Sequence, residues 1–256
     1  MPISDRGYRY GDGCFETIRI HGGAPFRLEA HFSRLRHSLE LLRIESGWSR
    51  EDLLQGMRKI AEANAIGEGL IRITVTAGER VTARGHATIT SRSLPEIPAN
   101  PALHISDLAR RLSGPLSQCK SIARSAESVG LREANAEGAF DAILLNEKGR
   151  VAETTARNVF VVAGGGLSTP PTYDGALAGV TRAAVLDIAR REKLRVRETS
   201  LSVERLRAGD EVFLTGSGVG VLGIASVDGH RYEMPGPVTG RIRAAYLAAL
   251  DGESQW

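Results

Sequence analysis

The stretch that decides the fold is FDAILLNEKGRVAE, residues 140–153. Apolar residues stand on both sides of a polar turn at residues 147–149, and this pattern predicts a β-hairpin. The hairpin ends on Glu153, so the chain delivers a carboxylate at the end of a strand. Lys120 precedes it in the polar, glycine-poor segment at residues 118–121. The lysine and the carboxylate are therefore the first two candidates for a functional site.

A lysine and a carboxylate delivered in this way suggest one particular chemistry. A lysine held near neutrality can form a Schiff base with an aldehyde cofactor. A carboxylate that faces a pyridine nitrogen keeps that nitrogen protonated, and the ring then withdraws electrons. A phosphorylated cofactor of this kind would also need a phosphate-binding site elsewhere in the chain.

The composition is that of an ordinary soluble protein. With 256 residues, 42% hydrophobic and 25% charged, the chain can bury a full core and is long enough for two domains. Its 33 basic and 30 acidic residues leave a net charge of only +3, and the arginines form no run, so nucleic-acid binding is not expected. No window reaches the roughly 18 uncharged apolar residues of a membrane helix, and neither export nor membrane anchoring is expected.

The cysteine content argues against disulfides and metal. Cys14 and Cys119 are too few for a disulfide framework and too isolated from the histidines for a zinc site. We therefore expect no metal and a reducing, cytoplasmic location.

The first part of the chain predicts a small α/β arrangement. Apolar residues recur at helical spacing from Leu28 to Arg43, and Ser49 with Asp52 is a signal for the start of a second helix. The turn at residues 22–23 closes a strand and starts its hairpin partner. The expected elements are strands at 14–21, 24–27 and 70–76, helices at 28–43 and 49–64, and a long loop at 77–88.

Residues 94–101 carry three prolines and predict a linker, because proline fits neither a helix interior nor a central strand. We therefore expect a small N-terminal α/β domain at residues 1–98 and a larger C-terminal domain, which carries Lys120, at 99–256. Helices and strands are mixed in order, so the fold class is α+β rather than a regular parallel winding. Beyond the linker we expect strands near 103 and at 194–200, 211–215 and 219–227, a hairpin within 139–162, and helices at 122–135, 180–193 and 238–250.

Two loops and an arginine could bind a phosphate. Residues 178–182 lie where a loop enters a helix, so the backbone amides of Val180 and Thr181 and the positive end of the helix dipole would face an anion. Residues 215–218, Thr-Gly-Ser-Gly, follow an apolar strand and offer hydroxyl and backbone donors. Arg34 could add a charge-assisted contact, because a guanidinium matches the geometry of a phosphate. Taken singly, each feature is also consistent with an ordinary helix start, turn or surface arginine.

Six short motifs are spread nearly from end to end of the chain, in the order RGYRYGDGCFETIR (6–19), HFSRL (31–35), Lys120, ETTARNVF (153–160), GVTR (179–182) and TGS (215–217). As a set they resemble the class IV aminotransferases, the pyridoxal-phosphate enzymes of fold type IV. This family includes branched-chain and D-amino acid aminotransferases, (R)-amine transaminases and aminodeoxychorismate lyases.

The resemblance implies a two-domain α+β subunit that works as a homodimer. Pyridoxal 5'-phosphate would lie in the cleft between the domains, and the neighbouring subunit would supply part of the substrate pocket. Lys120 would form the Schiff base and shuttle the proton, and Glu153 would face the pyridine nitrogen. Asn158 would order the backbone that follows Glu153. The remaining contacts implied are Arg34, Val180, Thr181 and Ser217 on the phosphate, and Gly218 at the substrate.

Further substrate contacts are implied at Phe15 and Arg19, which alternate with their neighbours on the first strand. The loop at residues 82–86 is similar to the Arg-x-His stretch of D-amino acid aminotransferases and to the Arg-Gly-aromatic stretch of aminodeoxychorismate lyases. Either similarity makes Arg84 a bidentate clamp for a carboxylate, with His86 assisting. The alternative is a solvated loop arginine.

The function that the resemblance implies is transfer of an amino group to an α-keto acid from a small amino acid, with D-amino acids preferred, or from an amine. One residue departs from the family pattern. Many relatives carry Asn or Tyr shortly after the lysine, near the phenolate oxygen of the cofactor, whereas residues 123–125 are Ala, Arg and Ser. Arg124 is the side chain that would act in their place.

Two other functions remain open. The same scaffold could be a lyase that releases pyruvate and 4-aminobenzoate from aminodeoxychorismate, which residues 11–15 and 84–85 favour. The chain could also be a binding or regulatory module without catalysis. Lys120 and Glu153 argue against that last function.

Overall fold

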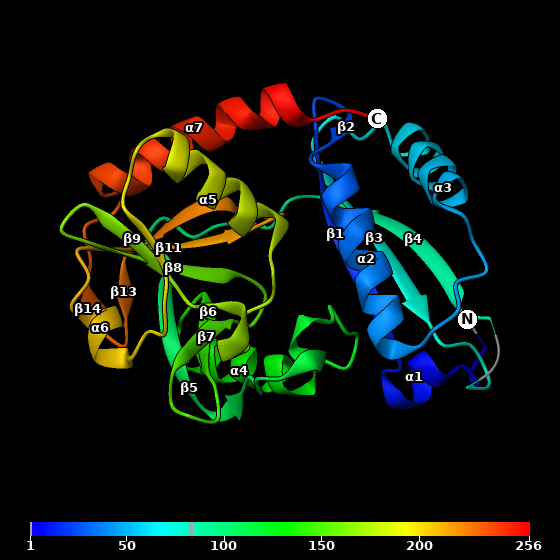
Figure 1. The fold of residues 1–256 in the computed structure, drawn as a ribbon, viewed down its shortest axis with the longest axis horizontal. Coiled ribbons are helices and arrows are strands. Elements are labelled where there is room, and N and C mark those ends of the chain that lie inside the picture. The colour runs from blue at the N-terminus through cyan, green and yellow to red at the C-terminus, as the bar shows by residue number, and fades with distance from the viewer. Residues whose placement is uncertain (1, 82–83) are drawn as a thin grey trace. The chain divides into compact units, whose positions relative to one another are not determined.

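The structure is a computed structural model that describes residues 2–81 and 84–256. These residues divide into two compact units. The first contains the residues up to Pro95 together with Cys119–Arg124 and Ala249–Trp256, and the second contains Glu96–Gln118 and Ser125–Ala248. Helices and strands are mixed in both units, as expected for an α+β chain (Figure 1).

The first unit is a sheet covered on one face by helices (Figure 1). Its elements are α1 (Arg6–Tyr10), β1 (Gly13–His21), β2 (Ala24–Pro25), α2 (Leu28–Leu42), α3 (Arg50–Ala63), β3 (Gly69–Thr76) and β4 (His86–Arg92). The strands pair antiparallel in the order β2-β1-β3-β4. Helix α2 packs against β1 and helix α3 packs against β4.

The two faces of this sheet differ in chemistry. Ile18 of β1 and Ile71 of β3 are direct partners, are fully buried and belong to the apolar core with α2 and α3. Directly opposed residues share a face, and successive residues point to opposite faces. Thr17 and Arg72, the next pair along the two strands, therefore lie on the other, polar face.

The sequence signals for both long helices of this unit are confirmed. Helix α2 buries His31, Leu35 and Ser38, which are spaced so that they share one side of the helix. Helix α3 begins at a capping box, in which the Ser49 side chain accepts from the Asp52 amide and the Asp52 side chain accepts from the Ser49 amide.

Strand β4 occupies residues that the sequence assigned in part to a loop. The predicted loop at 77–88 was wrong from His86 onward, because β4 begins there. Along β4 exposed and half-buried residues alternate, and only the side that carries Ala87 and Ile89 touches the core. Polar residues on the other side hide the strand from a search for apolar periodicity. Thr82 and Ala83 lie outside the described residues.

The segment Cys119–Arg124 belongs to the first unit, although it follows the predicted linker. The amide of Phe15 in β1 donates to the carbonyl of Lys120 over 2.9 Å. Strand β2 pairs only with the far end of β1, so this part of the β1 edge can accept the segment. The predicted domains at 1–98 and 99–256 differ from the observed units here, because backbone pairing places Lys120 with the N-terminal sheet.

The second unit is built on sheets of order β10-β9-β8-β11-β12 and β14-β13-β5-β6-β7. Its elements are β5 (Ala102–Arg110), η1 (Pro115–Gln118), α4 (Ser125–Ala136), β6 (Asp141–Leu145), β7 (Val151–Thr154), β8 (Asn158–Ala163), β9 (Gly166–Thr169), η2 (Thr172–Asp174), α5 (Val180–Arg191), β10 (Val196–Glu198), α6 (Val203–Arg207), β11 (Glu211–Gly216), β12 (Gly220–Ile224), β13 (Ser226–Val227), β14 (His230–Arg231) and α7 (Pro237–Glu253), whose last turn lies in the first unit. Helix α4 packs against β5 and β6, and α5 packs against β10 and β11.

The predicted hairpin is present as the antiparallel pair β6 and β7, whereas β8 enters the other sheet beside β11. Buried Asp141 stabilises the connection from β7 to β8. Its carboxylate accepts from the Thr154 hydroxyl over 2.8 Å and from the Thr155 amide over 3.2 Å, and it pairs with Arg157. These bonds hold the end of β7, where Glu153 stands.

Most remaining predicted elements are present with shifted ends. Helix α5 begins at Val180 as predicted, α4 begins at Ser125 rather than at 122, and the strand predicted at 194–200 is reduced to β10. Helices α1 and α6 were not predicted, because each is five residues long and too short to show a period. Among the described residues, no helix combines the length and apolar character needed to cross a membrane.

Candidate functional site

Glu153 is held in one position by bonds to both of its oxygens. Its Oε1 pairs with Nε of Arg111 over 3.1 Å. Its Oε2 accepts from the amide of Leu177 over 3.0 Å and from Nδ2 of Asn158 over 3.2 Å. Each carboxylate oxygen has two acceptor positions, so within the described residues Oε1 keeps one position for a further donor. Arg111 also pairs with Glu127 over 2.9 Å, and this second bond fixes the guanidinium.

Asn158 joins the Glu153 carboxylate to the start of helix α5. Besides Glu153, its Nδ2 donates to the carbonyl of Leu177 over 2.9 Å. A Cβ at Gly179, the residue before α5, would lie 2.1 Å from Oδ1 of Asn158, so only glycine fits there. No side chain caps this helix start, and the first turn with Val180 and Thr181 is buried. The structure thus brings these predicted phosphate ligands close to Asn158, which orders the backbone as expected.

The loop after β11 adds hydroxyl groups to the same region. Thr215 pairs in register with Asn158 across β11 and β8, so the two side chains lie on one face. Thr215 is 1% exposed, and its Oγ1 has no hydrogen-bond partner among the described residues. A buried hydroxyl without a partner is costly, and a polar ligand would remove that cost. Ser217 and Gly218 form the turn that follows, between β11 and β12.

In the first unit, helix α2 and strand β1 position Lys120. Its amide hydrogen-bonds to Oγ of Ser38 on α2 at 3.3 Å, and its carbonyl accepts from Phe15 on β1. The Lys120 ammonium lies 4.7 Å from the centre of the Phe15 ring. The side chain therefore lies on the polar face of the N-terminal sheet, at its β1 edge.

The Phe15 ring is surrounded by positive charge. The Arg72 guanidinium lies 3.6 Å from the ring centre and the Arg124 guanidinium 5.5 Å from it, in addition to Lys120. Burial lowers the pKa of Arg72, and repulsion from Arg124 and Arg92 lowers it further. Among the described residues, the hydrogen bond that Arg72 donates goes from Nε to Thr74, and no carboxylate pairs with it. This arrangement favours binding of an anion beside Phe15.

Arg34 is held by a carboxylate that the sequence analysis did not single out. Nε and Nη2 of Arg34 donate to the two oxygens of Glu16 over 2.8 and 2.7 Å. The Glu16 carboxylate also bonds Nδ1 of His31 over 2.7 Å, and it is 1% exposed. Burial raises the pKa of Glu16, but the charge and hydrogen bonds of Arg34 and His31 outweigh it and hold the pKa at about 2. Glu16 is therefore ionised at neutral pH.

The other predicted substrate residues lie away from the Phe15 ring. Arg19 is four residues further along β1, about 13 Å by strand rise, and pairs with Glu68 over 2.7 Å. His86 starts β4 at the sheet edge, where its Nδ1 bonds Asp5 at 2.8 Å. Arg84 is exposed, and its side chain lies near Gly47. In this chain the structure therefore does not bring Arg84 and His86 together with Lys120, and their roles stay predictions.

Three residues that shape the site were missed from the sequence. Glu16 could have been found, because strand alternation places it on the core side of β1, where a carboxylate needs a buried partner. Arg72 and Arg111 gave no such signal. Arg72 reaches Phe15 only through the pairing of β1 with β3, and Arg111 reaches Glu153 from another strand of the second unit.

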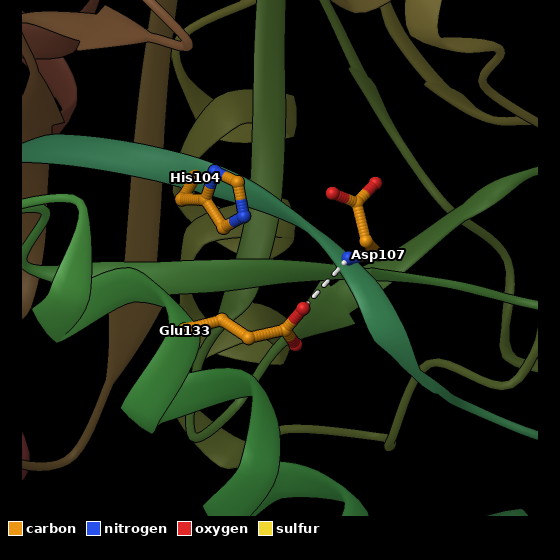
Figure 2. Close-up of side chains that lie close together, drawn as sticks. All are labelled: His104, Asp107 and Glu133. Carbon is orange, nitrogen blue, oxygen red and sulfur yellow. Dashed lines mark hydrogen bonds between the residues drawn. The ribbon is translucent and has the colours of Figure 1, made fainter.

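A second cluster, of His104, Asp107 and Glu133, has the residue types of a metal site (Figure 2). Its possible ligand atoms lie within 4.8 Å of one another. However, Oε1 of Glu133 accepts from the amides of Asp107 and Leu108, both at 3.1 Å, and Oε2 bonds the Ser106 hydroxyl. These bonds tie helix α4 to the irregular part of β5, and this structural role accounts for the position of Glu133.

Comparison with known proteins identifies similar sequences over nearly the whole chain. The family model for amino-transferase class IV matches residues 13–227. A Methanocaldococcus jannaschii protein, provisionally named a branched-chain-amino-acid aminotransferase, is 31% identical over 90% of this chain and 83% of its own length. The D-alanine aminotransferase of Bacillus licheniformis is 28% identical over 99% of this chain and 93% of its own.

Solved structures agree with the sequence comparisons. A branched-chain amino acid aminotransferase from T.th., solved with pyridoxamine 5'-phosphate, superposes with a TM-score of 0.91 at 25% identity, over 99% of this chain and 90% of that one. A Legionella pneumophila protein, provisionally assigned as a 4-amino-4-deoxychorismate lyase, superposes with a TM-score of 0.89 at 27% identity, over 97% and 95% of the two chains. The resemblance drawn from the motifs and the expected fold type are thereby confirmed.

Proposed function

Because this chain belongs to the amino-transferase class IV family, we propose that it uses pyridoxal 5'-phosphate to transfer an amino group from a small amino acid to an α-keto acid. The observation that carries the proposal is the environment of Glu153, an ion-paired and buried carboxylate with one acceptor position left. The relatives described above are named for D-alanine and for branched-chain amino acids. D-amino acids are the first donors to test, as the loop at residues 82–86 suggests.

The residues of the second unit fit the two ends of this cofactor. Oε1 of Glu153 would accept the N–H of the protonated ring nitrogen. The uncapped amides of Val180 and Thr181 and the partnerless hydroxyl of Thr215 are donors that a phosphate would satisfy. Ser217, in the turn after β11, would donate to the same phosphate. Thr215 is thus a phosphate candidate that the motifs alone did not indicate.

The first unit would supply the reacting amine. When bound, pyridoxal phosphate supplies an aldehyde for amino groups and a ring that withdraws electrons. Lys120 would hold the aldehyde and then move the proton between the substrate Cα and C4′ of the cofactor. Glu153 would keep the ring nitrogen protonated during this transfer. Since Lys120 belongs to the first unit and Glu153 to the second, the proposal requires residues of both units at one cofactor.

The charged surroundings of Phe15 support a substrate that carries a carboxylate. Arg72, stacked on the ring with no carboxylate partner among the described residues, would bind the carboxylate, and Arg124 would add a second charge. This arrangement supports an amino acid rather than a neutral amine as donor. Arg84 and His86 remain proposed as further carboxylate ligands.

Two further points belong to this proposal. We propose a homodimer, as the resemblance implies, and a cytoplasmic location, which the free, buried Cys14 and Cys119 support. A lyase acting on aminodeoxychorismate is the second candidate function, favoured by the fold similarity to the Legionella pneumophila protein.

Cofactor binding and donor screening test the proposal together. The purified protein should gain a near-visible absorbance band with pyridoxal phosphate, and Lys120→Ala should abolish it. Lys148→Ala, at the exposed hairpin turn, is the matched control and should keep the band. Donor screens with both enantiomers should form keto acid only when an acceptor is present. Pyruvate and 4-aminobenzoate formed without an acceptor would indicate the lyase, and a protein that stays colourless would indicate a non-catalytic module.

A further inference from the structure

A buried carboxylate beside Arg34 has no role in the chemistry proposed above. Glu16 follows Phe15 on β1, but it points to the opposite face, toward helix α2. Its side chain is 1% exposed and that of Arg34 is 10% exposed. Burying a carboxylate is costly unless its oxygens are fully bonded, so this arrangement requires a compensating bond network.

The network fixes how the Arg34 guanidinium is oriented. A guanidinium carries five N–H groups. Glu16 takes the N–H of Nε and one N–H of Nη2 in a bidentate pair. The other three N–H groups, on Nη1 and Nη2, therefore face away from Glu16. Two of them form a second edge that matches two oxygens of a phosphate.

His31 holds the carboxylate from the other side. Burial lowers the pKa of His31, and the charges of Arg34 and Lys120 add to this effect, while the bonds to Glu16 oppose it. A neutral His31 donates through Nδ1 to Glu16, which leaves the carboxylate its full charge for Arg34. His31 and Arg34 are three residues apart on α2 and Ser38 is four further on, so the side of the helix that orients Arg34 also contacts the Lys120 segment.

We propose that Glu16 is a positioning residue that aims the outer edge of the Arg34 guanidinium at the phosphate of the cofactor. The inference rests on the proposed function, in which Arg34 binds that phosphate. Its specific claim is that the placement of the Glu16 carboxylate, and not only its charge, determines how well the protein distinguishes the phosphorylated cofactor from the same molecule without phosphate.

The variant Glu16→Asp separates placement from charge. It keeps the carboxylate but shortens the side chain by one methylene, so the guanidinium must follow it away from the phosphate. The measurement is the dissociation constant of the cofactor-free protein for pyridoxal 5'-phosphate and for pyridoxal, and the ratio of the two is the readout. A general loss of structure would weaken both ligands alike, whereas misplacement of Arg34 weakens only the phosphorylated one.

We expect Glu16→Asp to reduce this ratio about tenfold or more, because a hydrogen bond to a charged group is worth at least that factor. Arg34→Gln should reduce the ratio at least as much. Glu253→Asp is the matched control, since Glu253 pairs with Arg27 just before the same helix, and it should leave the ratio unchanged.

If Glu16→Asp does not fold, Glu16→Gln decides between placement and charge. Removal of a negative charge near the phosphate would raise the ratio if Glu16 acted through charge alone, whereas loss of the bidentate pair lowers it. An unchanged ratio in Glu16→Asp, together with a reduced ratio in Arg34→Gln, would overturn the role of Glu16 alone. An unchanged ratio in Arg34→Gln would remove Arg34 from the phosphate site, and the inference with it.

Discussion

Loss of the Glu16 charge should destabilise the first unit in a pH-dependent way. The bonds from Arg34 and His31 lower the pKa of Glu16 from 4.5 to about 2. At about 1.4 kcal/mol per pKa unit, that difference corresponds to about 3 kcal/mol of stability. In Glu16→Gln this contribution is absent and Arg34 loses its charged partner, so we expect a loss of about 3–5 kcal/mol at neutral pH.

The sign follows from the lowered pKa. The unfolded chain binds a proton at Glu16 near pH 4.5, whereas the folded protein binds it only near pH 2. The Glu16 contribution is therefore complete above pH 4.5 and disappears as the pH falls toward 2. The difference in unfolding free energy between wild type and Glu16→Gln should shrink over this same range.

Tryptophan fluorescence during urea unfolding is a suitable assay, because the chain has two tryptophans, Trp48 and Trp256, and both belong to the first unit. The cofactor-free proteins would be compared at several pH values between about 2 and 7. The control Glu253→Gln removes a partly exposed pair with Arg27 and should cost no more than about 1 kcal/mol. A difference for Glu16→Gln that stays constant from pH 6 to pH 2 would refute the electrostatic reasoning.

Other substitutions have separate expected outcomes. Arg72→Gln should raise KM for carboxylate-bearing substrates about tenfold or more and leave amine donors without a carboxylate little affected, while Arg92→Gln, on the exposed end of β4, should change neither; equal effects on both donor types would contradict carboxylate binding. Arg111→Met removes the cation from two buried carboxylates, including Glu153, and should lower the unfolding free energy measured by circular dichroism by about 3–5 kcal/mol, so a cost below about 1 kcal/mol would contradict a buried ion pair. Ser49→Ala breaks the capping box of α3 and should cost about 1 kcal/mol by tryptophan fluorescence, and an unchanged urea midpoint would show that the cap contributes nothing.

The sequence predicted the elements that carry a strong local signal. Helices α2 and α3 were found from apolar spacing and a capping box, and the β6–β7 hairpin was found from its turn. Strand β4 was missed, because its core-facing residues are few and polar residues occupy its other side. The place of the Lys120 segment was also missed, because it depends on pairing with a strand about a hundred residues earlier.

The candidate site divides in the same way. Motifs were sufficient to single out Lys120, Glu153 and Arg34, because each stands in a short, ordered pattern typical of one family. They did not indicate Thr215 or Arg72 as contributors. Thr215 became a candidate only when β11 placed its hydroxyl beside Asn158 without a partner among the described residues.

The sequence by itself therefore determined the helices and hairpins, the family, and the side chains that carry the chemistry, because these depend on residues close together in the chain. Only the tertiary structure decided which charges face one another. The pairs Glu16 with Arg34 and Glu153 with Arg111, and the arginine stacked on Phe15, depend on strand register and helix packing. A shift of one residue in register would turn these side chains to the opposite face and separate the partners.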